Sequence, residues 1–137
     1  MREIHFTVKG APVAKARPRM NRSTGIVYTP KKTQDAERVI KAAFLAKVEE
    51  HNIPTKNPVE VKITYFYEPP KSYSKAKREA LMWTGKTTKP DLDNLTKTVL
   101  DALNGVAWED DAQVVKLSAN KTYAQSTYTH VTITWKE

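Results

Sequence analysis

Every second side chain is apolar or aromatic along Val59 to Tyr67, and no other stretch constrains the fold as strongly. Because successive side chains of a β-strand point to opposite faces, this alternation predicts a strand that is buried on one face only. Pro69 and Pro70 end it. A half-buried strand needs partner strands and a covering layer, so we expect a sheet with helices packed against it.

The same alternation predicts the other strands. Glu3 to Val8 forms the first, and the C-terminal region supplies two more, at Val114 to Tyr123 and Tyr128 to Trp135. A loop rich in Arg, Lys and Pro runs from Pro12 to Gly25, and it leads into a short strand at Ile26 to Tyr28.

Three helices are predicted between the strands. The longest covers Pro30 to His51, and a short one follows Ser74 as far as Met82 or Trp83, with Gly85 closing it. A third begins at Asp91 to Asp93 and ends near Leu103, before Gly105. Without regular βαβ alternation, we expect a single α+β domain over residues 1–137, with a mixed or antiparallel sheet of about four strands packed by two or three helices.

Charge is distributed unevenly along the chain, whose formal net charge is +8. Residues 1–90 hold 19 Lys or Arg against 8 Asp or Glu, whereas residues 91–137 hold 4 against 7. The excess of basic residues indicates a polyanionic partner. Carboxylates repel phosphate, so a purely electrostatic DNA-binding surface gains nothing from them, but a site that holds Mg²⁺ against phosphate requires them.

Several classes of protein are excluded. The chain contains no cysteine, which excludes disulfide scaffolds and thiolate metal sites. No window approaches the roughly 18 apolar residues of a membrane span, so we expect no membrane partner. The first residues lack the pattern of a signal peptide, and a cytoplasmic location is expected.

The acidic residues begin directly after Pro90. A proline disfavours helix at the preceding residue, so the chain enters this stretch extended, and Asp91 and Asp93 can share one face. Lys97 lies one helical turn beyond Asp93, where it can neutralise charge on a phosphate. After Gly105 the chain returns to Glu109, Asp110 and Asp111. Oxygen ligands for Mg²⁺ would then come from Asp91, Asp93 and Asp111.

Ordinary structural roles also explain these acidic residues. Asp91 or Asp93 can cap the helix, and Lys97 can form i,i+4 ion pairs with Asp93 and Asp101. The acidic residues from Glu109 to Asp111 can form a solvated turn. For Asp101 and Asn104 we favour the structural role.

The chain resembles the RusA family of Holliday junction resolvases over Lys89 to Leu95, Lys97, Leu100 to Gly105 and Trp108 to Val114. Pro12 to Arg19 is similar to the basic segment of phage and prophage members. The resemblance implies a homodimeric, Mg²⁺-dependent endodeoxyribonuclease, with Mn²⁺ as a substitute, that nicks paired strands of a four-way DNA junction in recombination and repair. It also implies catalytic roles for the aspartates and one lysine, at Asp91, Asp93, Asp111 and Lys97.

A second candidate site is the basic segment. Arg17 precedes Pro18 and is therefore biased to extended chain, so Lys15, Arg17 and Arg19 are expected to alternate onto one side. Three cations on one edge suit a DNA phosphate backbone. A solvated loop is the alternative. Tyr73 and Trp83 receive no site role, because aromatic residues beside helices are more often core or interface residues.

Three functions remain open from the sequence. The first is a nuclease that resolves four-way junctions. The second is a nucleic-acid-binding module whose acidic residues are structural, and the third is a metal-dependent nuclease for another branched DNA. A four-way junction has approximate two-fold symmetry and needs two cuts, so a dimer with two-fold symmetry is the natural assembly for the first.

Overall fold

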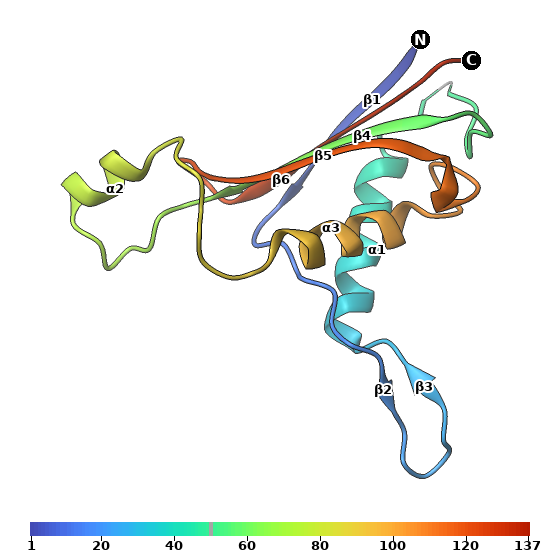
Figure 1. Ribbon diagram of the computed structural model, residues 1–137, viewed down its shortest axis with the longest axis horizontal. Helices are drawn as coiled ribbons and strands as arrows, with labels where there is room; N and C mark the ends of the chain where they lie inside the picture. Colours follow the sequence, from blue (N-terminus) through green and yellow to red (C-terminus); the bar gives the residue numbers. More distant parts are fainter. Residues whose placement is uncertain (50) are drawn as a thin grey trace.

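A four-stranded mixed sheet forms the centre of the computed structural model, which describes residues 1–49 and 51–137 (Figure 1). Its strand order is β1-β6-β4-β5. Strand β4 pairs with β5 in parallel, whereas the β1–β6 and β4–β6 pairs are antiparallel. The strands are β1 (Arg2–Lys9), β4 (Val59–Tyr67), β5 (Val114–Tyr123) and β6 (Tyr128–Trp135). The predicted fold class and these four strands are confirmed.

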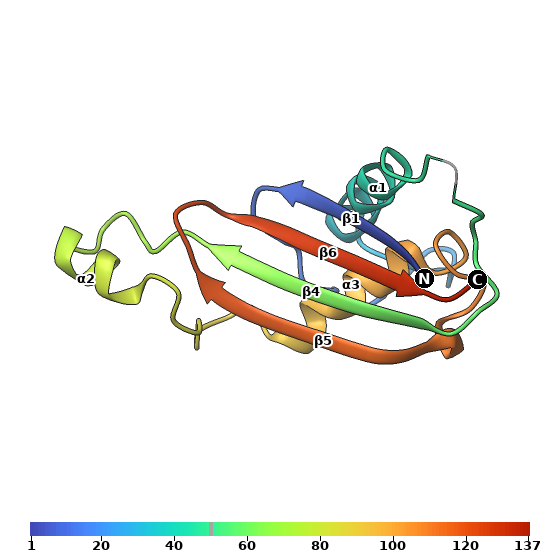
Figure 2. The same cartoon turned by 90° about the horizontal axis from the view of Figure 1, so that it is seen from above.

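Helices α1 (Lys31–Leu45) and α3 (Leu92–Leu103) cover one face of the sheet, and both lie beneath it in Figure 1 and behind it in Figure 2. The alternation in β4 explains this, because its odd-numbered residues from Val59 to Tyr65 are buried and face the helices. They meet apolar residues of α1 and α3 in one hydrophobic core, which includes Phe44, Ile63, Tyr65, Leu95, Val99 and Leu103. In the part of the chain that the structure describes, no helix covers the opposite face of the sheet (Figure 2).

The long connection between the parallel strands β4 and β5 contains α2 (Lys75–Leu81) and then α3. Helix α2 projects beyond the end of the sheet (Figures 1 and 2). Ser74 caps it as predicted, since its hydroxyl accepts a hydrogen bond from the backbone N–H of Lys77 at 3.2 Å. The loop after α2 therefore carries the chain from the tip of the molecule back to the start of α3.

Three predicted details are wrong. Helix α1 ends at Leu45 rather than near His51, and Glu49 has a positive φ of 47°; residue 50, which the predicted helix included, lies outside the described residues. The loop from Pro12 to Gly25 contains a strand, β2 (Arg19–Met20), which pairs with β3 (Val27–Tyr28). Gly85 does not close α2, because Trp83 takes the left-handed conformation, with φ 63°.

Among the described residues, no helix combines the length and the apolar character that crossing a bilayer requires.

Candidate active site

The start of α3 presents two carboxylates. Asp91 occupies the N-cap position with extended backbone angles, φ −69° and ψ 137°, but its side chain makes no capping hydrogen bond. Its Oδ1 atom instead accepts a hydrogen bond from the Nζ atom of Lys89 at 2.8 Å. Asp93 lies in the first turn of the helix and is exposed. Capping therefore does not explain why Asp91 is an aspartate.

The electrostatic environment keeps Asp91 ionised. The hydrogen bond and positive charge of Lys89 hold the pKa of the Asp91 carboxyl below its usual range, with a smaller contribution from Lys121. The same pair raises the pKa of Lys89. The pairing with Lys89 thus favours the anionic form of Asp91, which is the form that binds a cation.

Two further lysines hold the loop that leads to Asp91. The Nζ atom of Lys121, on β5, donates hydrogen bonds to the carbonyl oxygens of Thr88 and Pro90, both at 2.8 Å. Lys86 donates to the carbonyl of Lys89 at 2.9 Å, and burial lowers the pKa of Lys86. No sequence pattern links Lys121 to this loop, because the contact depends on how β5 lies beside α3.

Lys97 is exposed on α3 at i+4 from Asp93, one turn along the helix. Asp91 and Asp93 therefore lie at the start of α3, and Lys97 lies near the middle of the same helix. We call Asp91 and Asp93 the carboxylate pair.

Asp111 lies elsewhere. It begins a short 3-10 helix, η1 (Asp111–Gln113), and its Oδ1 atom accepts a hydrogen bond from the indole N–H of Trp108 at 2.8 Å. Trp108 is fully buried and forms a β-bridge with Asn104, the C-cap of α3. Asp111 is therefore anchored beside the C-terminal end of α3.

The helix separates the two groups of acids. Asp93 and Leu103 are ten residues apart on α3, which corresponds to about 15 Å at 1.5 Å per residue. Figure 1 likewise shows the loop entering α3 and the start of β5 at opposite ends of this helix. Within residues 1–49 and 51–137, no group of three or more His, Cys, Asp or Glu side chains could hold a metal ion. The expectation that Asp91, Asp93 and Asp111 converge within one chain is therefore wrong.

Structural roles account for other acids of the same region. Asp110 caps η1, because its Oδ2 atom accepts a hydrogen bond from the backbone N–H of Ala112 at 3.1 Å. Its own N–H donates to the side chain of Gln113 at 2.8 Å, which completes a capping box. Asp101 forms an ion pair with Lys15 at 3.0 Å.

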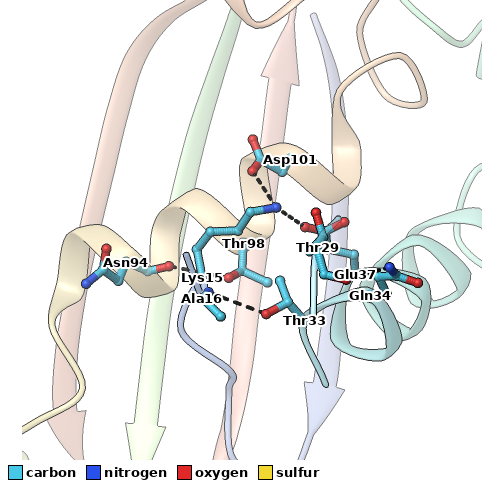
Figure 3. Close-up of polar contacts among 9 residues, drawn as sticks. All are labelled: Lys15, Ala16, Thr29, Thr33, Gln34, Glu37, Asn94, Thr98 and Asp101. Atoms are coloured by element: carbon cyan, nitrogen blue, oxygen red, sulfur yellow. Dashed lines mark hydrogen bonds and ion pairs between the residues drawn. The ribbon is translucent and has the colours of Figure 1, made fainter. Parts of the chain in front are cut away.

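Lys15 joins three segments of the chain (Figure 3). Its Nζ atom lies 2.6 Å from a carboxylate oxygen of Glu37 on α1 and 3.0 Å from one of Asp101 on α3. Its backbone N–H donates to the carbonyl of Asn94 at 2.9 Å. The side chain is only 16% exposed. Lys15 therefore does not share an exposed edge with Arg17 and Arg19; that prediction is wrong for Lys15, because two carboxylates draw its ammonium inward.

Replacing Lys15 by methionine is expected to destabilise the fold by about 2 kcal/mol, because Glu37 and Asp101 would be left facing each other without a cation. Partial burial lowers the pKa of Lys15, but the two carboxylates outweigh it and raise this pKa above 10.5. The difference from wild type is therefore present at neutral pH and shrinks as the pH rises through the raised value. Urea unfolding at several pH values measures it. Lys41→Met, at an exposed position of α1, is the control; equal losses for both variants would contradict the assignment.

Arg17 and Arg19 remain exposed. Arg19 belongs to the two-stranded ribbon of β2 and β3, which projects away from the sheet and helices (Figure 1). The ribbon places its positive charge on an arm beyond the body of the protein. Such an arm suits contact with a phosphate backbone.

The carboxylate pair, the neighbouring lysines and the basic arm are features of the class of enzymes that act on nucleic acid. The profile of the family described as Endodeoxyribonuclease RusA matches residues 9–134. The chain belongs to this family, and it is an endodeoxyribonuclease.

Two relatives are similar to this chain. "Uncharacterized protein YqaN" of Bacillus subtilis (strain 168) is 35% identical over 136 residues, which cover 95% of this chain and 94% of the relative. "Crossover junction endodeoxyribonuclease rusA" of Lactococcus phage r1t is 32% identical over 78 residues, which cover 56% of this chain and 54% of the relative.

Proposed function

We propose that this chain is a Mg²⁺-dependent homodimer that resolves four-way DNA junctions by paired phosphodiester nicks, in recombination and repair, within one endonuclease domain over residues 1–137. The observation that carries the proposal is the exposed carboxylate pair at the start of α3, whose first member makes no helix-capping hydrogen bond and is paired with Lys89 instead. The crossover junction activity in the name of the phage relative supports the substrate.

The carboxylate pair suits Mg²⁺, which prefers oxygen ligands and commonly binds proteins through one or two carboxylates. Bound Mg²⁺, or Mn²⁺ in its place, supplies Lewis-acid stabilisation of charge on the attacked phosphate. Asp91 and Asp93 would hold the ion. Lys97, one turn along the same helix, is proposed to contact the scissile phosphate and to stabilise the negative charge that develops there.

Asp111 joins this site only if a second protomer supplies it. Within one chain α3 lies between Asp111 and the carboxylate pair, since about 15 Å of helix axis separates Asp93 from Leu103. In a dimer with two-fold symmetry, the carboxylate pair of each protomer can meet Asp111 of the partner, which gives two equivalent sites. Two sites match the two opposite strands that must be cut.

Arg17 and Arg19 are proposed to contact DNA phosphates outside the active site. Contacts of this kind contribute affinity for all DNA shapes and weaken with salt. These contacts therefore do not discriminate in favour of a junction, whereas the spacing of the two active sites does contribute to that discrimination.

The proposed function is tested by cleavage of three substrates of matched sequence in Mg²⁺. We expect paired nicks in the four-way junction, at a rate at least about tenfold above that on a flap or a linear duplex, because only the junction places two strands at both sites of a dimer. Equal cutting of all three substrates would contradict junction resolution. Preferential cutting of the flap would identify a nuclease for another branched DNA, and binding without cleavage would indicate a non-catalytic module.

A further inference from the structure

Trp83 is two-thirds exposed, at 66%, whereas Trp108 and Trp135 are buried. Its indole ring meets Phe66 of β4 edge-on, with ring centroids 6.4 Å apart and an interplanar angle of 85°. Phe66 in turn stacks on Tyr128 of β6, at 4.6 Å and 24°. Trp83, Phe66 and Tyr128 therefore form a continuous set of rings, which we call the Trp83 cluster.

The backbone at Trp83 is unfavourable for a bulky residue. Its φ of 63° lies in the left-handed region, which glycine adopts without cost and in which a large side chain is an outlier. Hydrogen bonds hold it there: the N–H of Trp83 donates to the carbonyl of Tyr123, and the N–H of Tyr123 donates to the carbonyl of Thr84, both at 2.9 Å. Neither exposure nor this conformation benefits stability. Such a combination is typical of a residue that is retained for binding.

The surroundings of the Trp83 cluster are strongly basic. Lys77 lies over the ring of Tyr73, with its Nζ atom 3.7 Å from the ring centroid, and Lys75 is almost fully exposed. Residues 71–89 carry one acid, Glu79, and six cations, of which Arg78 is paired with Glu68 and Lys89 with Asp91; the cations are Lys71, Lys75, Lys77, Arg78, Lys86 and Lys89. An apolar protein or lipid partner would not interact with this positive charge. A DNA base attached to its phosphate backbone matches both the exposed aromatic ring and the surrounding cations.

The Trp83 cluster is also tied to the carboxylate pair. Gly85 forms a β-bridge with Thr122, and the N–H of Lys86 donates to the carbonyl of Lys121 at 3.2 Å. Lys121 is the residue whose ammonium holds Thr88 and Pro90, directly before Asp91. A single short loop, fixed to the end of β5, thus connects the exposed indole to the active site.

We propose that Trp83 is a stacking platform for one unstacked DNA base next to the nicked phosphate. The inference rests on the proposed function and extends it, because it names the part of the substrate that is read near the site. Bases at the branch point of a junction can leave their stack at lower cost than bases within a duplex, so a platform here favours junctions over linear DNA.

The test measures DNA binding in EDTA, without cleavage. We expect Trp83→Ala to weaken binding to a four-way junction about 10- to 100-fold, and Trp83→Phe to remain within about threefold of wild type, because a ring still stacks. Affinity for a matched linear duplex should change less than threefold. Val39→Ala, at an exposed apolar residue of α1, is the matched control and should leave both affinities unchanged.

Two further measurements keep the result interpretable. Trp83→Gly removes the ring and also relieves the left-handed backbone, so its melting temperature should equal or exceed that of wild type while junction affinity falls as for Trp83→Ala. Single-stranded oligonucleotides should quench the indole fluorescence of wild type but not that of Trp83→Phe, because the two remaining tryptophans are buried.

Three outcomes would contradict the proposed role of Trp83 as a stacking platform. The first is unchanged junction affinity in Trp83→Ala, and the second is an equal loss of affinity for junction and duplex. The third is a wild-type dimer that becomes monomeric in Trp83→Ala, which would make Trp83 an interface residue. Failure of the proposed junction-resolving function would be distinguishable from failure of the Trp83 proposal. In that case wild type shows no preference for a junction in the cleavage test, whereas quenching by single-stranded DNA still decides whether Trp83 stacks on bases.

Discussion

Asp93→Asn is expected to abolish junction cleavage, with a loss of at least about 10³-fold in rate, because it removes one of the two carboxylates proposed to hold Mg²⁺. Affinity for the junction should be unchanged or higher, since the substitution removes a negative charge beside phosphate. Cleavage is measured on a labelled four-way junction in Mg²⁺, and binding in EDTA. Full residual activity would remove Asp93 from the catalytic site.

Asp101→Asn is the matched control for this experiment. Asp101 lies on α3 two turns beyond Asp93 and is already paired with Lys15. We expect cleavage by this variant to remain within about threefold of wild type, because the ion pair is remote from the carboxylate pair. A loss as large as that of Asp93→Asn would instead indicate a general effect of charge on this helix.

The second large effect is recovery of activity on mixing two inactive variants. Asp93→Asn and Asp111→Asn should each be inactive alone. If the partner supplies Asp111, a mixed dimer contains one site with both defects and one intact site. After complete subunit exchange, half of the dimers are mixed, so strand nicking should return to about one quarter of the wild-type rate.

The reaction product also distinguishes activity of the mixed dimer from activity of contaminating wild-type enzyme. A mixed dimer has one working site, so it should nick a plasmid-borne cruciform without linearising it, whereas wild type linearises it. Mixing Asp91→Asn with Asp93→Asn is the control and should restore nothing, because both defects lie in the same carboxylate pair. Absence of recovery in the Asp93→Asn and Asp111→Asn mixture, with subunit exchange demonstrated, would show that Asp111 does not complete the site from the partner.

Local patterns predicted most of the fold. Val59 to Tyr67 is a strand with the predicted bounds, because alternation over nine residues reports burial of one face directly. The end of α1 was misplaced, since residues beyond Leu45 still favour a helix by composition. Strand β2 was missed because two residues, Arg19 and Met20, are too few for an alternation to be visible.

In the candidate site, too, the features that depend on nearby residues were predictable from the sequence, and those that depend on distant segments were not. Asp91, Asp93 and Lys97 are close in sequence, so the first half of one helix suffices to carry all three. The inward turn of Lys15 and the support from Lys121 depend on contacts with distant segments, which no spacing encodes. The position of Asp111 depends on the direction in which α3 carries the chain. The number and spacing of the acidic residues therefore could not show that Asp111 lies apart from Asp91 and Asp93 within one protomer.

Strand β6 is the last strand in the chain but lies inside the sheet, between β1 and β4. Arg2 pairs with Trp135, so the partner of the first strand comes from a segment that is far away in sequence. Until β6 has been synthesised, β1 therefore lacks its one neighbouring strand in the sheet. Contacts this distant in sequence slow folding, and they make the emerging N-terminal half the part most exposed to aggregation.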